Sequence, residues 1–421
     1  MAKNKILEVI LFGQEIGKVG YDIDKQVSYF QYNPAYLESG QYADIFPYIV
    51  KRIKPVQVFH QFEGETFRGL PPMIADSLPD MFGNIIFKEW FEAKNKALRK
   101  ITPLEQLTYV ANRGMGAIEY QPSAKIPKTS TIHIDEIVEV LKKVLDVKND
   151  TTAEALNDAA LLNIFKIGTS AGGARPKILI SEHKETGKII PGDIEYSQAY
   201  NHYLVKLSMN EDWGYNREKI EYAYYLMAQE VGINMMPSKL IDNKHFATLR
   251  YDRQNGEKRH VLTVSGLTGW DFKKPENSTY ENVFRLALDM KVPHKDIIEL
   301  FRRMVFNVIY YNIDDHLKNH SFIYDKQTNT WSLSPAYDIT YPLNINANYT
   351  NISRALSINN KRADITLEDV LTIAEAYAIK NPKAIISDVQ KATQSWDEMT
   401  SQLDIPQKVT RSIKREFKEL I

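Results

Sequence analysis

The 421-residue chain contains no cysteine. Disulfides, thiolate metal sites and a cysteine nucleophile are therefore excluded, and the composition fits a reducing compartment. The chain also lacks an excess of positive or negative charge, because Lys plus Arg and Asp plus Glu each number 53. This neutral balance argues against a protein that coats nucleic acid with its whole surface, although it allows a local basic patch.

Long apolar runs are missing as well, and no uninterrupted stretch reaches the length that a bilayer requires. The opening segment MAKNKILEVILFG has an apolar patch, but Glu8 interrupts it and no small-residue cleavage site follows. Internal repeats and low-complexity tracts are also absent. The sequence therefore predicts a cytoplasmic protein with no membrane association.

The length exceeds what one hydrophobic core usually fills, so two or three domains or lobes are expected. Up to about residue 120, strands around a turn at Gly13 and Gln14 mix with helical segments, including one expected from about Asp80. YQPSAKIPKTS at 120–130 is the best linker candidate. Residues 131–253 suggest a Gly-rich turn, a strand, a helix and a strand, and the remainder is mostly helical. This order predicts an α+β fold.

The segment YYNIDDHLKNHSF places many charged and amide groups after the apolar run MVFNVI. Asp314 and Asn319 have the D-x-x-x-x-N spacing of a kinase catalytic loop, in which the Asp accepts a proton and the Asn holds magnesium. FIYD and TWSL predict a hairpin around KQTNT. Asp338 follows it, where a kinase has its D-F-G aspartate, although the triplet here is Asp-Ile-Thr.

Any one of these acids, taken alone, is better interpreted as a helix cap or a surface group, and only the spaced set favours chemistry. His316 and His320 are four residues apart without an HExxH pattern, so a role beside the catalytic Asp or at phosphate is favoured over zinc binding. A metal-dependent phosphohydrolase using Asp314, Asp315, His316 and Asp338 remains an alternative.

IGTSAGGARPK is a Gly-rich stretch in which Gly172 and Gly173 would let backbone N–H groups approach phosphate oxygens. It is neither a Walker A loop nor a GxGxxG loop, and an ordinary hairpin turn is the simpler interpretation. Arg175 and Lys177 behind the glycines favour phosphate binding.

Lys206, in the strand-like HYLVKL, should point to the opposite face from its apolar neighbours. A lysine that faces inward needs an anionic partner, whereas a surface lysine on an edge strand would not. The anion could be a nucleotide phosphate, with Glu221 orienting the lysine and Glu218 or Glu230 as competitors. In HFATLRYDR, backbone groups of Leu249 to Tyr251 could then bind adenine.

In this order, the segments resemble the HipA-family kinases, the toxins of type II toxin–antitoxin modules. NIDDHLKNHSF followed by LSPAYDI is the most specific part, and SAGGARPKILI, EYAYYLMAQEVGI and LRYDR add order and spacing. VGYDIDKQVSYFQYNPAYL, SLPDMFGN and NRGMGAIEYQP are similar to the family's N-terminal subdomain. The resemblance covers nearly the whole chain.

The resemblance implies a two-lobed, protein-kinase-like α+β fold with an extra N-terminal α/β subdomain. The N-terminal subdomain would span 1–122, the kinase N-lobe 131–253 and the mostly helical C-lobe 254–421. The implied activity is a serine/threonine kinase that uses ATP and Mg²⁺. Its residues would be the catalytic Asp314, the metal ligands Asn319 and Asp338, the autophosphorylated Ser170, and the ATP-binding Gly172, Gly173, Ala174, Arg175, Lys177, Lys206, Leu249, Arg250, Tyr251, His316, Lys318 and Tyr337.

Family resemblance also implies partners and regulation. The protein substrate would be an aminoacyl-tRNA synthetase or a similar translation protein, and phosphate added to Ser170 would expel the loop and silence the enzyme. A HipB-like helix-turn-helix antitoxin would carry most of the DNA binding, since Lys361 and Arg362 alone make a thin basic loop. The alternative is a catalytically silent, kinase-like corepressor that works with such an antitoxin.

Overall fold

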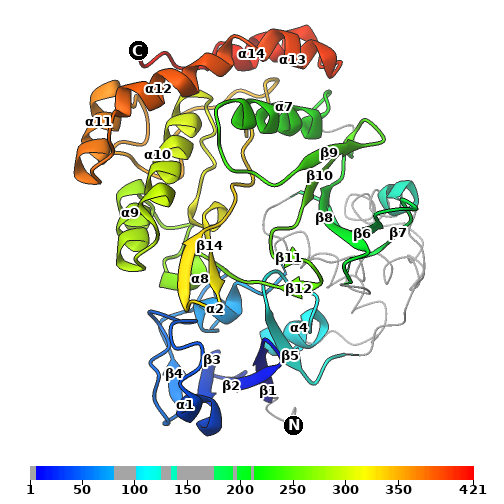
Figure 1. The fold of residues 1–421 in the computed structure, drawn as a ribbon, viewed down its shortest axis with the longest axis vertical. Coiled ribbons are helices and arrows are strands. Elements are labelled where there is room, and N and C mark those ends of the chain that lie inside the picture. The colour runs from blue at the N-terminus through cyan, green and yellow to red at the C-terminus, as the bar shows by residue number, and fades with distance from the viewer. Residues whose placement is uncertain (1–5, 80–100, 125–133, 140–174, 193–196, 210–212) are drawn as a thin grey trace. The chain divides into compact units, whose positions relative to one another are not determined.

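The computed structural model describes residues 6–79, 101–124, 134–139, 175–192, 197–209 and 213–421. Contacts divide the chain into two compact units (Figure 1). The first unit comprises 1–209, 247–262 and 266–269, and the second comprises 210–246, 263–265 and 270–421. The three-part division into 1–122, 131–253 and 254–421 stays a prediction.

The first unit begins with an antiparallel sheet in the order β4-β3-β2-β1-β5. Its strands are β1 (Ile6–Leu11), β2 (Gln14–Asp22), β3 (Val27–Tyr32), β4 (Gln57–Phe59) and β5 (Ile118–Gln121). The predicted first hairpin is confirmed, with the positive φ values of its turn at Phe12 and Gly13 and with Gln14 already in β2. Alternating residues such as Val9, Val19 and Phe30 are fully buried and form the core on one face.

Within the described ranges, three helices accompany this sheet, and each begins with proline at its first turn: α1 (Pro34–Ser39), α2 (Pro72–Ala75) and α4 (Pro103–Val110). Proline fits there because the first helical N–H groups have no intrahelical acceptor. At α4, Thr102 and Glu105 add a capping box. The helix expected from about Asp80 and most of the expected linker lie outside the described residues.

A second sheet has the order β7-β6-β8-β10-β9. Its strands are β6 (Lys177–His183), β7 (Ile189–Pro191), β8 (Tyr200–Lys206), β9 (Ser238–Ile241) and β10 (His245–Leu249). The short pair β11 (Arg253–Gln254) and β12 (Glu257–Lys258) follows, and a three-stranded sheet contains β13 (His260–Thr263), β14 (Ser321–Asp325) and β15 (Thr330–Leu333). The predicted hairpin around KQTNT is confirmed, because Phe322 pairs with Leu333 and Tyr324 with Trp331.

Helices dominate the second unit, and the part that the sequence predicts to be mostly helical, 254–421, contributes most of them. The helices of the second unit in the described ranges are α7 (Arg217–Glu230), α9 (Tyr280–Asp289), α10 (His294–Ile309), α11 (Leu367–Ala376), α12 (Pro382–Gln390), α13 (Trp396–Gln402) and α14 (Gln407–Lys414), with the short η1 (Pro275–Asn277), η2 (Leu317–Asn319) and η3 (Lys391–Thr393). The short α8 (Val264–Thr268) is divided between the two units. The expected apolar face of α10 is buried. None of the helices in the described ranges is long and apolar enough to cross a membrane.

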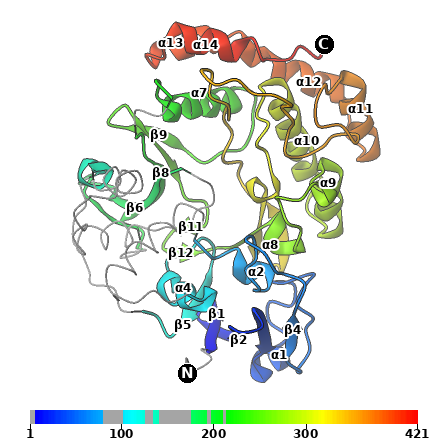
Figure 2. The same cartoon turned by 180° about the vertical axis from the view of Figure 1, so that it is seen from behind.

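The C-terminal segment packs against its own unit, which was the default expectation for this amphipathic stretch. Figures 1 and 2 show α13 and α14 running alongside α7. The helix ends at Lys414, earlier than the sequence pattern suggests. Beyond it, Phe417 contacts the rings of Tyr310 and Trp396, with centroids 4.9 and 5.1 Å apart. These rings anchor the chain end beside the C-terminus of α10.

Candidate active site

The loop between α10 and β14 is closed by hydrogen bonds of its own. The carbonyl oxygen of Asp314 accepts the His316 backbone N–H at 2.9 Å and the Asn319 side-chain amide at 2.8 Å. Asn319 also donates its backbone N–H to the His316 carbonyl at 2.8 Å. The Asn319 amide nitrogen is thus used within the loop, and Oδ1 is the atom that can serve as a ligand. The Asp314 side chain is exposed.

The β14–β15 hairpin returns the chain to this loop and positions Asp338. Asp338 has φ +56°, a left-handed conformation that is sparsely populated by non-glycine residues and is often found at functional sites. The preceding Tyr337 hydroxyl donates to the Lys318 carbonyl at 2.8 Å and contacts the Ser321 hydroxyl. Tyr337 therefore fixes the segment of Asp338 against the loop that carries Asn319.

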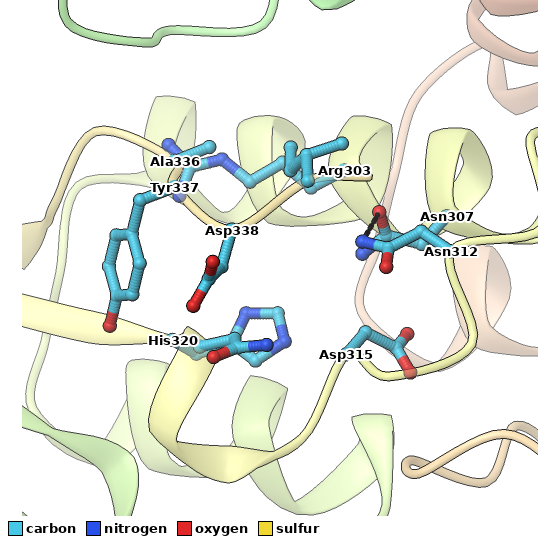
Figure 3. Close-up of a pocket in the computed structure, with 10 residues that line it drawn as sticks. Arg303, Asn307, Asn312, Asp315, His320, Ala336, Tyr337 and Asp338 are labelled. Atoms are coloured by element: carbon cyan, nitrogen blue, oxygen red, sulfur yellow. Dashed lines mark hydrogen bonds between the residues drawn. The ribbon is translucent and has the colours of Figure 1, made fainter. Parts of the chain in front are cut away.

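Asn319 and Asp338 line one small pocket, together with His320, Asp315 and residues of α10 (Figure 3). Its volume of ≈ 10 Å³ is about that of one water-sized occupant. An amide oxygen and a carboxylate are the oxygen ligands that Mg²⁺ prefers, so the residues present fit this ion. The structure thus brings the two predicted metal ligands together, and their role stays a prediction.

Asp315 is oriented differently from its neighbour Asp314. Its carboxylate points away from Asp338 in Figure 3 and is 1% exposed as a side chain. Oδ2 accepts the Tyr280 hydroxyl at 2.6 Å and the Arg354 guanidinium at 2.7 Å. Burial lowers the pKa of Arg354, but the charge of Asp315 outweighs this and raises it above its ordinary value. Asp315 thus belongs to a buried ion pair through Oδ2, and the phosphohydrolase interpretation stays an alternative.

The network beneath the loop continues into α10. The Asn307 side chain donates to the Tyr280 hydroxyl at 3.0 Å, and Asn312 donates to Asn307 Oδ1 at 2.9 Å. Sequence reasoning missed Tyr280, Asn307 and Arg354, because they come from α9, α10 and the segment after Asp338. No local spacing signals that these segments meet.

The loop histidines have separate environments. The His316 ring lies 4.8 Å from that of Phe272, and Lys318 Nζ lies 5.6 Å from the same ring. His320 is buried, and burial lowers its pKa to about 4, so it is neutral at physiological pH. No group of potential metal ligands in the described part of the chain includes either histidine. ATP contacts by His316, Lys318 and Tyr337 stay predictions, and the Tyr337 hydroxyl already has two partners.

In the first unit, Lys206 of β8 lies directly opposite Lys177 of β6 in the antiparallel register. Their side chains therefore project from the same face of the sheet. Both residues are buried, at 6% and 5% exposure. Strand β8 is flanked by β6 and β10, so the interpretation of Lys206 as a surface lysine on an edge strand is wrong. The predicted phosphate contacts of Lys177 and Lys206 would therefore come from one face of the sheet.

The three glutamates proposed as partners of Lys206 are separated by burial. Glu218 and Glu221 are buried in α7. Glu230 is exposed, and its carboxylate accepts a hydrogen bond from Ser395 at 2.7 Å. Glu230 therefore has a role at the helix end, and the choice between the other two stays open.

Arg250 was expected among the ATP-binding residues, but its side chain is committed elsewhere. The guanidinium is buried and forms a bidentate pair with Asp252, at 2.9 and 2.7 Å. Its backbone N–H donates to the His202 carbonyl at 2.8 Å. An adenine contact would therefore depend on the remaining backbone groups of 249–251 and on Leu249 and Tyr251. Of the predicted phosphate loop, Arg175 is described, while Ser170, Gly172, Gly173 and Ala174 lie outside the described residues.

The two basic side chains of the loop at Lys361 and Arg362 both bind groups of the protein itself. Lys361 pairs with Asp369 at 2.9 Å. Arg362 donates to four backbone carbonyls, which are those of Arg354, Ala355, Pro275 and Ser278. A guanidinium with these partners braces the segment structurally, and direct DNA contact by this loop stays untested.

Comparisons with known proteins agree with this arrangement. Residues 7–121 match the HipA N-terminal domain, and residues 169–396 match the HipA-like C-terminal domain. The fold is similar to that of Shewanella oneidensis MR-1 HipA, solved with HipB and operator DNA. That match has a TM-score of 0.66 and 14% identity, and it covers 97% of this chain and 94% of the other.

Two further proteins match a smaller share of this chain. The Sinorhizobium fredii (strain NBRC 101917 / NGR234) protein named "Putative kinase Y4dM" is 24% identical over 231 residues. That match covers 50% of this chain and 55% of the relative, so it spans about half the length of each. The Helicobacter pylori proinflammatory kinase CtkA matches with 13% identity and a TM-score of 0.38, covering 58% of this chain and 88% of that one.

The fold and the two domain matches define the class of protein: a two-part α+β chain with the architecture of HipA. The C-terminal domain match alone covers more than half of the chain, and the chain belongs to the HipA family. The fold and family expected from the sequence are thereby confirmed.

Proposed function

We propose that this protein is a serine/threonine kinase of the HipA type that uses ATP and Mg²⁺ and acts as the toxin of a type II toxin–antitoxin module. The observation that carries the proposal is the geometry of Asp314, Asn319 and Asp338. One loop presents an exposed carboxylate and an oriented amide oxygen, and a left-handed aspartate lines the same pocket as that amide. A surface acid or a helix cap would require none of this.

In the proposed reaction, Asp314 accepts the proton of a substrate serine or threonine hydroxyl. The hydroxyl oxygen forms a bond to the γ-phosphorus of ATP, the bond from that phosphorus to the β–γ bridging oxygen breaks, and ADP leaves. Asn319 and Asp338 would hold Mg²⁺, which neutralises charge on the phosphates. Lys177 and Lys206 would bind phosphate oxygens through two buried ammonium groups, with Arg175, His316 and Lys318 as further candidates.

Substrate and regulation belong to the same proposal. Ser170 would be the autophosphorylation site, and an aminoacyl-tRNA synthetase or a similar translation protein would be the external substrate. A HipB-like helix-turn-helix antitoxin would be the partner and would contact DNA, as supported by the family and by the inward orientation of Arg362. Coexpression with such an antitoxin should yield a complex on size-exclusion chromatography, and separate elution would contradict this part.

The test is the intact mass of the purified, unphosphorylated protein after incubation with Mg²⁺ and ATP. We expect wild type to gain one phosphate on Ser170 and Asp314→Asn to gain none. Asp325→Asn is the matched control, since Asp325 is an exposed acid on β14, and it should behave as wild type. If wild type gains no phosphate and transfers none to external substrates, the silent corepressor becomes the better proposal. Metal-dependent release of phosphate from a phosphate ester, with water as the acceptor and no need for ATP, would favour a phosphohydrolase.

A further inference from the structure

The two adjacent aspartates of the loop have opposite environments. Asp314 is exposed, whereas the Asp315 carboxylate is inside the second unit. The loop between α10 and η2 has no helical or strand hydrogen bonds at these residues. The hydrogen bonds that the Asp314 carbonyl accepts from His316 and Asn319 close the loop on itself, and contacts of the residues on either side of Asp314 tie the loop to the rest of the second unit.

On the C-terminal side, the Asp315 carboxylate is the anchor. Tyr280 and Arg354 both donate to its Oδ2, at 2.6 and 2.7 Å. Both donors are 4% exposed or less, so water does not compete with these bonds. Tyr280 is itself oriented by Asn307 of α10, through a 3.0 Å hydrogen bond. The anchor is thus connected to two helices of the second unit.

On the N-terminal side, the anchor is a backbone hydrogen bond. Ala355 donates its N–H to the carbonyl of Ile313 at 2.7 Å, one residue before Asp314. Arg354 and Ala355 are consecutive, so the same short segment holds Asp314 from both sides. Arg362 secures this segment by donating to the carbonyls of Arg354 and Ala355 and to those of Pro275 and Ser278 near the start of α9.

We infer that Tyr280, Asp315 and Arg354 are positioning residues that fix the backbone of Asp314, and that the segment 354–362 is the strut that holds them. The inference rests on the proposed function for its kinetic consequence, since Asp314 would be the proton acceptor there. A displacement of about 1 Å at a reacting group can cost about 10²-fold in rate. Loosening the anchor should therefore lower kcat while ATP binding is retained.

The test uses Tyr280→Phe, which retains the ring and removes the hydroxyl that orients Asp315. Tyr120→Phe is the matched control, because Tyr120 is 1% exposed and its hydroxyl donates to Ser77 at 2.8 Å in the first unit. We expect kcat for phosphoryl transfer to fall roughly 10- to 100-fold in Tyr280→Phe. The KM for ATP should change less than about twofold, and Tyr120→Phe should retain the wild-type kcat.

Amide hydrogen exchange gives a readout that does not depend on activity. Peptides covering 310–320 should exchange faster in Tyr280→Phe than in wild type or in Tyr120→Phe. A second pair, Arg354→Lys and Arg354→Met, should show partial recovery of kcat and protection with lysine, because only lysine retains a positive donor.

The outcomes separate the two proposals. Unchanged kcat and unchanged exchange in Tyr280→Phe and in Arg354→Met would overturn the inference, even if wild type proves to be a kinase. Wild type could instead show no phosphoryl transfer while peptides covering 310–320 exchange faster in Tyr280→Phe than in wild type. That result would support the anchor and overturn the proposed function.

Discussion

Replacing Asp252 by asparagine should destabilise the first unit severely. The Asp252 carboxylate is fully buried and accepts four hydrogen bonds. Two come from Arg250, one from Arg253 Nη1 at 2.8 Å and one from the Gly116 backbone N–H at 2.8 Å. Both guanidinium groups also donate to the Gly114 carbonyl. Asp252 thus supplies the negative charge that balances two buried cations and ties 250–253 to the loop at 114–116.

The size of the effect follows from the charge that remains. Asparagine keeps the shape and one acceptor oxygen, but Arg250 and Arg253 lose their counter-ion while still buried. Removing one partner of a buried ion pair typically costs about 3–5 kcal/mol. Burial by itself raises the pKa of Asp252, but the two guanidinium groups outweigh this and hold its pKa well below its usual range. The wild-type contribution is therefore present above about pH 4 and is lost as the pH falls below it.

The assay is urea unfolding at pH 7, followed by circular dichroism and by hydrogen exchange of peptides covering 112–119. Asp24→Asn is the control, because Asp24 is an exposed turn residue, and it should change the unfolding free energy by less than about 0.5 kcal/mol. A loss below about 1 kcal/mol for Asp252→Asn, with wild-type protection at 112–119, would refute the reasoning. It would mean that the two guanidinium groups find solvent or other partners.

Three further perturbations test other parts of the chain. Burial lowers the pKa of His260 to about 4, so this side chain should account for about 3 kcal/mol of the stability lost as the pH falls from 6.5 to 4, and His260→Gln should remove that share of the slope in urea titrations at several pH values, while His320, whose pKa is also lowered, keeps part of it. Gly17→Ala should lower the unfolding free energy by about 1–3 kcal/mol, because a Cβ there would lie 2.5 Å from the Gln31 carbonyl oxygen, whereas Gly20→Ala in the same strand meets nothing closer than 3.8 Å and should be tolerated. Arg362→Met should raise hydrogen exchange at 354–358, since four carbonyls lose their donor, and unchanged exchange there would contradict the bracing role.

Local spacing was enough to predict the loop and its two candidate ligands. Asp314, Asn319 and Asp338 lie within 25 residues, and the hairpin between them is encoded by its own apolar alternation and turn. Lys206 could also be found, because a lysine between two apolar residues of a strand is visible in the sequence. Its burial next to Lys177 could not, since the register of β6 and β8 is a property of the sheet.

The residues that support the loop from below could not be predicted from local sequence patterns. Tyr280 in α9, Asn307 in α10 and Arg354 after Asp338 are separated by tens of residues, and each looks ordinary in its own segment. The role of the Arg250 side chain was out of reach for a related reason, and the nucleotide contact that the position in LRYDR suggested for 249–251 stays a prediction. Asp252, two residues after Arg250, could have indicated an ion pair. The Gly114 carbonyl, which also accepts a hydrogen bond from Arg250 and helps to explain why the pair is buried, is far away in the sequence.

The contrast between Asp314 and Asp315 is the strongest argument that the loop is built for chemistry. A buried ion pair is poor evidence for stability, since well-packed apolar residues often do as well. Its distinctive property is directional, because a buried carboxylate oxygen that accepts two hydrogen bonds, here Oδ2 of Asp315, tolerates little displacement of its backbone. Here the burial of Asp315 with Tyr280 and Arg354 holds the backbone next to an exposed neighbour, Asp314. A loop that only connects α10 to β14 would not need that arrangement, whereas the proton acceptor that we propose for Asp314 would depend on it.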